Sequence, residues 1–128
     1  MASLLRYLWV APVSLPAAGI ALLARMSGGQ AMVHEGVLEA SDGFLTTLLA
    51  RIYPPMVISA ITLGHVVLAR TRADLDATRS HERVHVRQFE RWGALFPFLY
   101  LGASLAALLG GRHVYHDNRF EREACRLA

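Results

Sequence analysis

The residues best suited to chemistry in this chain lie in the pentapeptide HERVH, where His81 and His85 stand four apart and Glu82 follows the first histidine. On an α-helix this spacing puts both imidazoles on one face, one turn apart, close enough to share a metal ion. Glu82 then lies beside the metal, where its carboxylate can take a proton from a bound water. Zinc with two such histidines, a third protein ligand and one open position is a hydrolytic centre. The motif therefore predicts a zinc hydrolase, most often a peptidase.

The helix predicted around this motif has two different faces. At 100° per residue, the side that carries His81 also carries Val84, His85, Gln88 and Trp92. The opposite side carries Arg83, Arg87, Glu90 and Arg91. We therefore expect the histidines to face the protein interior and the arginines to face water. The alternative is that two histidines and a glutamate decorate an ordinary surface helix, because the pattern fixes only three positions.

The ends of this helix also have sequence signals. Asp74 or Asp76 can cap its start, and Gly93 is a plausible stop directly after Trp92.

A third metal ligand is expected from the C-terminal stretch NRFEREACRLA, residues 118–128. With this stretch the chain resembles the gluzincins, zinc peptidases in which a glutamate from a later helix completes HExxH, often within ExxAD. Glu121 matches the ligand glutamate and Ala124 the alanine. Cys125 departs from the pattern, because the family carries there an aspartate that orients a histidine ligand. Glu123 is the alternative ligand, since a two-residue slip would turn it toward the metal.

The resemblance extends to about half of the chain. The strings AITLGHVVLA (60–69) and HVRQFERWG (85–93), with the later asparagine-Phe-Glu run, are similar to a group of small bacterial membrane proteins with a gluzincin-like site. The resemblance implies a fold and a zinc ion rather than a particular substrate.

Composition indicates a membrane protein of one domain. The chain has 128 residues, of which 54% are hydrophobic, and this is too apolar for a typical soluble protein. All 13 basic residues are arginines, and the net charge is only +3. No basic patch is interleaved with aromatic residues, so we expect no nucleic-acid partner. The single Cys125 excludes an internal disulfide.

An uncharged apolar run over residues 7–24 lies between Arg6 and Arg25 and approaches the length of a bilayer span. We predict a membrane anchor over residues 1–26 and a zincin-like domain over residues 27–128. The alternative is a cleaved signal peptide, for which the segment at residues 29–31 is a poor cleavage site. We expect a bacterial inner-membrane protein, and the arginine distribution leaves the side of the site open.

Three further segments form the predicted small domain. Residues 31–40 are strand material with Gly36 at a bend, and residues 44–53 have helical leucine spacing that ends at Pro54-Pro55. Residues 57–69 are rich in β-branched residues and read as a strand broken at Gly64. By resemblance to zincins this strand offers its edge to an extended substrate, and the alternative is an internal core strand.

The apolar segment 94–111 poses a geometric problem. If it crossed the bilayer as one straight helix, Glu121 would emerge on the face opposite His81 and His85. The conflict disappears if Gly93 reverses the chain and the segment runs antiparallel to the metal helix, as a buried or half-embedded helix. The site would then lie close to the membrane surface.

Four other histidines can be weighed individually. His113 and His116, together with Tyr115, precede the ligand helix and could stabilise an oxyanion, although polar loop residues are the more common case. His34 and His65 lie in strand-like segments and are expected to be structural.

Together these patterns predict an α+β, zincin-like fold: an N-terminal transmembrane helix, a small sheet, the HExxH helix packed antiparallel on an apolar helix, and a C-terminal ligand helix. His81, His85 and Glu121 would bind Zn²⁺, and Glu82 would act as general base on a peptide substrate. The main alternative is a non-catalytic metal-binding or structural membrane protein. A further alternative is hydrolysis of a lipid or a small amide.

Overall fold

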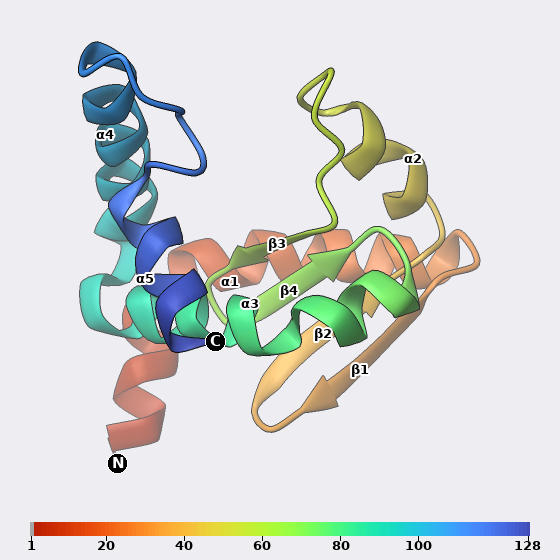
Figure 1. Ribbon diagram of the computed structural model, residues 1–128. Helices are drawn as coiled ribbons and strands as arrows, with labels where there is room; N and C mark the ends of the chain where they lie inside the picture. Colours follow the sequence, from red (N-terminus) through yellow and green to blue (C-terminus); the bar gives the residue numbers. More distant parts are fainter. Residues whose placement is uncertain (1) are drawn as a thin grey trace.

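The structure is a computed structural model and describes residues 2–128. Its elements in chain order are α1 (Ala2–Met26), β1 (Gln30–His34), β2 (Val37–Ser41), α2 (Leu45–Arg51), β3 (Ala60–Leu63), β4 (Val66–Ala69), α3 (Arg72–Trp92), a short 3-10 turn (Gly93–Leu95), α4 (Phe96–Leu109) and α5 (Arg119–Leu127). This arrangement confirms the predicted α+β class with an N-terminal apolar helix and a small sheet (Figure 1).

The four strands form one mixed sheet in the order β1-β2-β4-β3. Each predicted strand segment folds as an antiparallel hairpin, β1 with β2 and β3 with β4, and the two hairpins join through a parallel pairing of β2 with β4. Gly36 and Gly64 occupy the two hairpin turns with φ of 78° and 68°, a left-handed conformation that favours glycine. The bends predicted at these two glycines are confirmed, and β3 is an edge strand.

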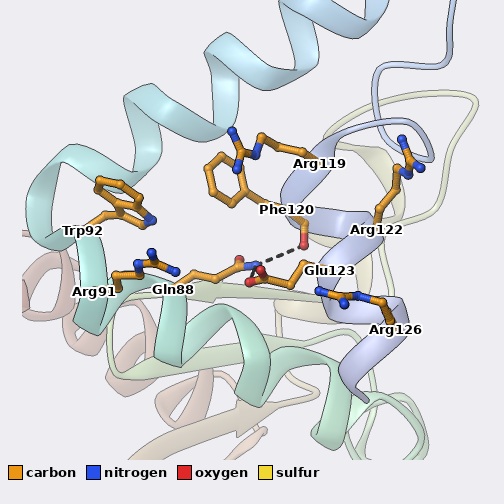
Figure 2. A pocket seen from close by; sticks show the side chains of 8 residues that line it. All are labelled: Gln88, Arg91, Trp92, Arg119, Phe120, Arg122, Glu123 and Arg126. Atoms are coloured by element: carbon orange, nitrogen blue, oxygen red, sulfur yellow. Dashed lines mark hydrogen bonds between the residues drawn. The ribbon is translucent and has the colours of Figure 1, made fainter.

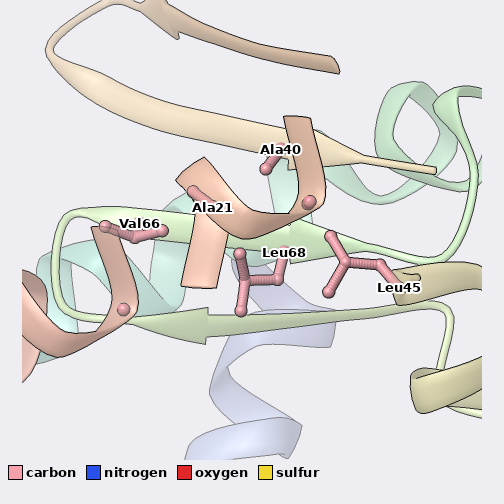
Figure 3. Packing of buried hydrophobic residues seen from close by; sticks show 7 residues of the cluster. Ala21, Ala40, Leu45, Val66 and Leu68 are labelled. Carbon is pink, nitrogen blue, oxygen red and sulfur yellow. The ribbon is translucent and has the colours of Figure 1, made fainter. Parts of the chain in front are cut away.

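The sheet separates two helical layers, with α1 behind it and α3 in front of it (Figure 1). Successive residues of a strand point to opposite faces, so all four residues of β4 are buried. Val66 and Leu68 pack with Ala17, Ala21 and Ala24 of α1, as Figure 3 shows in part. On the other face, the residues that pack together include Val67, Ala69, Leu75 and Val86. The central strand therefore holds both helices in place.

α1 contacts the sheet along most of its length. The Tyr7 hydroxyl donates to the Gly36 carbonyl (2.7 Å), and the Ser14 hydroxyl accepts from the backbone N–H of His65 (2.9 Å). The opposite side of α1 is apolar and exposed, and includes Leu4, Leu5, Leu8, Leu15, Leu22 and Leu23. The anchor over residues 1–26 and the domain over 27–128 stay a prediction, and α1 is also one layer of the fold.

Two helical stretches, Leu4–Met26 and Arg72–Leu109, are long and apolar enough to cross a membrane. Length and composition are the whole basis of this finding, and a buried core helix or a signal sequence has the same properties.

α3 begins earlier than either predicted cap. Thr71 is extended and its hydroxyl accepts from the backbone N–H of Asp74 (3.1 Å), so Thr71 is the N-cap and the prediction of Asp74 or Asp76 was wrong. Asp74 lies in the first turn, where its charge suits the helix dipole. The predicted end is confirmed: α3 stops at Trp92, and Gly93 follows with φ of 63°.

α4 does not run antiparallel along α3, so that prediction was wrong. The two helices form a V that opens from Gly93, and α5 lies between its arms (Figures 1 and 2). The reason is aromatic packing: the ring of Phe96 contacts both Phe89 of α3 (4.6 Å between centroids) and Phe120 of α5 (5.0 Å). α5 therefore fills the space that a returning α4 would have taken, and most of α4 is exposed rather than buried.

Candidate metal centre

His81, His85 and Glu121 come together although 40 residues separate the first from the last. Each offers one ligand atom, and these atoms all lie within 4.8 Å of one another. The Nε2 atoms of His81 and His85 lie 2.9 Å and 3.1 Å from the Glu121 carboxylate. His85 and Glu121 are buried and His81 is half-buried. This cluster could hold a metal ion.

Asn118 places Glu121 at this position. Its side-chain oxygen caps α5 by accepting from the backbone N–H of Phe120 (2.8 Å). Its amide donates to the Tyr100 carbonyl (3.0 Å) and to the Ser104 hydroxyl (2.8 Å), both on α4. The fully buried Asn118 thus joins the start of the ligand helix to α4. An asparagine three residues before a glutamate is a helix-start signal that could have identified it from the sequence.

Gln88 determines which nitrogen of His85 carries the hydrogen. Its amide nitrogen donates to the Phe120 carbonyl (3.1 Å) and to the Glu123 carboxylate (2.9 Å), as Figure 2 shows. Its oxygen therefore faces Nδ1 of His85 at 2.8 Å. An amide oxygen can only accept, so His85 Nδ1 must be the donor.

With this tautomer, a positive charge between His85 and Glu121 would be stabilising. A neutral imidazole has one N–H, so with Nδ1 protonated, Nε2 of His85 presents a lone pair to the Glu121 carboxylate at 3.1 Å. Two acceptors at that distance repel each other unless a cation lies between them, either a second ring proton or a metal ion. Two imidazole nitrogens and one carboxylate are also a common donor set of catalytic zinc sites. The residues present therefore fit a metal ion.

Glu121 is held in its ionised form. Burial alone would raise its pKa. When His85 carries the second ring proton, hydrogen bonds from His81 and His85 and the charge of His85 outweigh burial and hold that pKa well below its usual range. The Tyr100 hydroxyl contributes by donating to the second carboxylate oxygen at 2.5 Å. Glu121 is consequently a carboxylate at neutral pH, the form that binds metal ions.

Glu82 lies directly beside the cluster. One of its oxygens is 3.9 Å from Nε2 of His81, and the other accepts from the Thr62 hydroxyl at 3.0 Å. Thr62 belongs to the edge strand β3, so the strand and the metal helix meet at this carboxylate. The sequence contains no local signal for this contact, which spans 20 residues.

The structure separates the two candidate glutamates. Glu123 lies against Gln88 and outside the cluster, whereas Glu121 is the glutamate that lies with His81 and His85. Cys125, which stands where the gluzincin pattern has an aspartate, places its sulfur 3.9 Å from Nδ1 of His81. Residue 125 thus lies beside His81, where the gluzincin pattern has its orienting aspartate, but a thiol forms much weaker hydrogen bonds than a carboxylate.

The remaining candidates lie in the loop before α5. His113 and His116 are exposed, and Nδ1 of His113 accepts from the backbone N–H groups of Tyr115 and His116, as structural loop residues do. Tyr115 is half-buried, and burial together with the charge of Glu121 raises its pKa. Its hydroxyl therefore stays protonated at neutral pH.

Of the two other histidines, His65 is a hydrogen-bonded structural residue as expected, whereas the side chain of His34 is exposed. His65 is buried, its Nε2 lies 2.8 Å from Glu90 and its ring packs on Tyr7. His34 ends β1, and its carbonyl accepts from Arg83 (2.8 Å).

Comparisons of the chain with models of known families, with curated proteins and with solved structures found no match. The resemblance to gluzincins therefore remains an expectation from motif residues, and the geometry of the site has to carry the functional argument.

Proposed function

We propose that the protein is a membrane-associated, zinc-dependent hydrolase whose reaction is peptide hydrolysis. The observation that supports this most directly is the convergence of His81, His85 and Glu121, with the buried carboxylate of Glu82 next to them. Zinc bound there would lower the pKa of a bound water and polarise a substrate carbonyl.

Glu82 acts in this proposal as general base. The Thr62 hydroxyl occupies one carboxylate oxygen, which leaves the other, near His81, to accept a proton from the attacking water. The same oxygen can then deliver the proton to the leaving amine. A carboxylate held by one fixed hydrogen bond keeps its orientation through both transfers.

The edge strand β3 supplies a place for the substrate. β3 has a sheet neighbour only on the β4 side, and Thr62 in its middle contacts Glu82. An extended peptide that pairs with the open edge of β3 would pass its backbone beside the metal ligands. The proposed substrate is therefore a peptide or protein segment in extended form.

Tyr115 is the proposed donor to the oxyanion. Its protonated hydroxyl comes from the loop that leads to Glu121, and such donors commonly supplement the metal. His113 and His116 are weaker candidates because both are exposed.

The membrane assignment rests on exposed apolar surface. In addition to the outer side of α1, the exposed apolar residues of α4 are Phe98, Leu101, Leu105, Leu108 and Leu109, and Leu95 is exposed just before it. Its 14 residues span about 21 Å, less than the roughly 30 Å hydrocarbon core, so α4 enters the bilayer only partly. We propose the bacterial inner membrane as the location, and the protein should stay in the membrane fraction after an alkaline wash.

Metal analysis and substrate profiling test the proposal in sequence. Purified protein should carry one zinc per chain, and His81→Ala or Glu121→Gln should abolish it, whereas the control Glu123→Gln should keep it. Zinc lost from the Glu123 variant alone would overturn the ligand assignment.

With peptide libraries, Glu82→Gln should keep zinc and lower the cleavage rate about 10²- to 10⁴-fold. If zinc is bound and Glu82→Gln changes no cleavage, the site is a non-catalytic metal site. A panel of lipid and small-amide substrates tests the remaining alternative.

A further inference from the structure

A second site adjoins the metal centre on the far side of Gln88. A pocket of about 470 Å³ lies between the end of α3 and α5, and we call it the arginine pocket. Its lining includes four arginines, Arg91, Arg119, Arg122 and Arg126. Figure 2 shows the guanidinium groups of Arg91, Arg119 and Arg126 turned toward the space between the helices, whereas Arg122 points away.

The charges of this pocket are not balanced within the protein. Glu123 is its one acidic lining residue, and the Glu123 carboxylate already accepts from the Gln88 amide. Among the described residues, no ion pair within 4.0 Å joins any of the four arginines to an acid. By contrast, the arginines at the start of α3 and beside the sheet are paired: Arg70, Arg72, Arg79 and Arg83. The pocket therefore keeps a net charge of +3 with its guanidinium donors available.

Aromatic contacts hold two of these arginines in place. The guanidinium of Arg91 lies over the Trp92 ring at 5.3 Å, and that of Arg119 lies over the Phe120 ring at 5.4 Å. Such stacking limits the freedom of a long side chain while leaving its N–H groups at the edge of the plane free to donate. These two arginine side chains therefore lose less conformational entropy when they bind an anion, because stacking already restricts them in the free protein.

We propose that the arginine pocket binds a phosphate group. One carboxylate is satisfied by a single bidentate guanidinium, whereas several arginines around one space match the larger number of oxygens and the higher charge of a phosphate. The phosphate can belong to a lipid headgroup or to a free phosphate compound. The exposed Trp92, which lines the pocket at the end of α3, is an aromatic residue of the kind found at membrane interfaces, and it places this site near the proposed bilayer surface.

The test measures phosphate binding without any involvement of zinc. Full-length protein in a non-ionic detergent, with its metal removed by the uncharged chelator phenanthroline, is titrated with inorganic phosphate by calorimetry. In a second arm the titrant is dioctanoyl phosphatidic acid in mixed micelles, and dioctanoylglycerol serves as the lipid without phosphate. Phosphatidic acid that binds about tenfold more tightly than inorganic phosphate would identify a lipid headgroup. Equal affinities would identify a free phosphate compound.

Two charge-matched variants show whether binding is local. Arg119→Gln with Arg126→Gln should weaken binding at least about tenfold, because two charge-assisted contacts are lost. Arg25→Gln with Arg51→Gln removes two exposed arginines elsewhere, and its affinity should stay within about twofold. Binding of neither phosphate probe to the wild-type protein, or an equal loss in both variants, would overturn the proposal. Because the metal is removed, these results do not depend on hydrolase activity.

Discussion

At the scale of single residues, the centre depends on side chains that bind no metal themselves. Gln88 fixes the hydrogen on Nδ1 of His85, and Tyr100 donates to the Glu121 carboxylate. Such partners orient the ligands and raise their basicity. The gluzincin pattern led us to expect an acid at position 125 that orients a histidine. In the structure Cys125 lies beside His81, and Gln88 is the hydrogen-bonding partner of His85.

Gln88→Leu should therefore weaken zinc binding although every ligand remains. Without an acceptor for Nδ1, the His85 ring loses its fixed tautomer and orientation, and we expect the zinc Kd to rise about 10- to 100-fold. Competition with a chromogenic chelator measures this change. Glu123→Gln is the control, because it alters the other contact of the Gln88 amide and leaves the acceptor for His85 in place. An unchanged zinc Kd in Gln88→Leu would show that the His85 tautomer is set by something else.

At the scale of elements, two connections position α3. The chain turns sharply at Gly93 between α3 and α4, and Glu39 on β2 binds α3 through Arg79 (3.0 Å) and Arg83 (2.7 Å). The first connection directs α4 and α5 toward His81 and His85, and the second holds the middle of α3 against the sheet.

Gly93→Ala should be strongly destabilising. Gly93 has φ of 63° and ψ of −144°, and an added Cβ would collide with the Trp9 ring of α1. We expect a loss of at least about 2 kcal/mol in the free energy of unfolding. Gly102→Ala is the matched control within α4, where an added Cβ meets nothing within 4 Å, and it should be neutral or stabilise by about 0.5–1 kcal/mol. Equal effects in denaturant unfolding would contradict the role assigned to Gly93.

Glu39 should make stability depend on acid pH. Burial raises its pKa, but hydrogen bonds from Arg79 and Arg83 outweigh burial and hold the pKa below its ordinary value. A carboxyl group whose pKa is lowered by folding stabilises the protein above its unfolded pKa, about 4.3. This contribution is lost as the pH falls through the lower, folded value.

Glu39→Gln should accordingly cost roughly 3 kcal/mol at pH 7, because two partly buried guanidinium groups lose the buried carboxylate that they share, and Arg79 keeps only its pair with Asp76 (3.1 Å). The difference from the wild-type protein should shrink as the pH falls below about 4. Denaturant unfolding at several pH values measures it. A difference that stays constant between pH 7 and pH 3 would show that the Glu39 charge is not the cause.

At the scale of the whole molecule, α1 has two different sides. Its inner alanines cover Val66 and Leu68 of the central strand, and its outer leucines are exposed and suited to lipid. A helix that served only as an anchor would need no such contact with the sheet. The proposed membrane contact and the packing of the sheet thus involve the same helix.

Removal of residues 1–26 should abolish folding rather than release a soluble domain. The truncated chain would expose most of one face of the sheet, and burial of that apolar surface is a main source of stability in a small domain. Circular dichroism and zinc content of the fragment 27–128 measure the result. A folded, zinc-binding fragment would instead support an anchor that is independent of the domain.

The sequence by itself determined the local features of this protein. The histidine spacing places two imidazoles on one helix face, Gly36 and Gly64 turn the two hairpins, and Gly93 ends the metal helix, because each depends on neighbouring residues and on the allowed φ and ψ angles. The order of the elements and their types followed from such signals.

Only the tertiary structure decided which distant groups meet. The placement of Glu121 rather than Glu123 beside the histidines, the contact of Gln88 with Phe120 that orients its amide, and the V between α3 and α4 depend on the packing of α5. The local sequence pattern does not predict these contacts, because the packing of Phe96 between Phe89 and Phe120 determines where α5 lies. The motif contributes His81, His85 and Glu82 from one helix, and the long-range packing brings Glu121 to the two histidines.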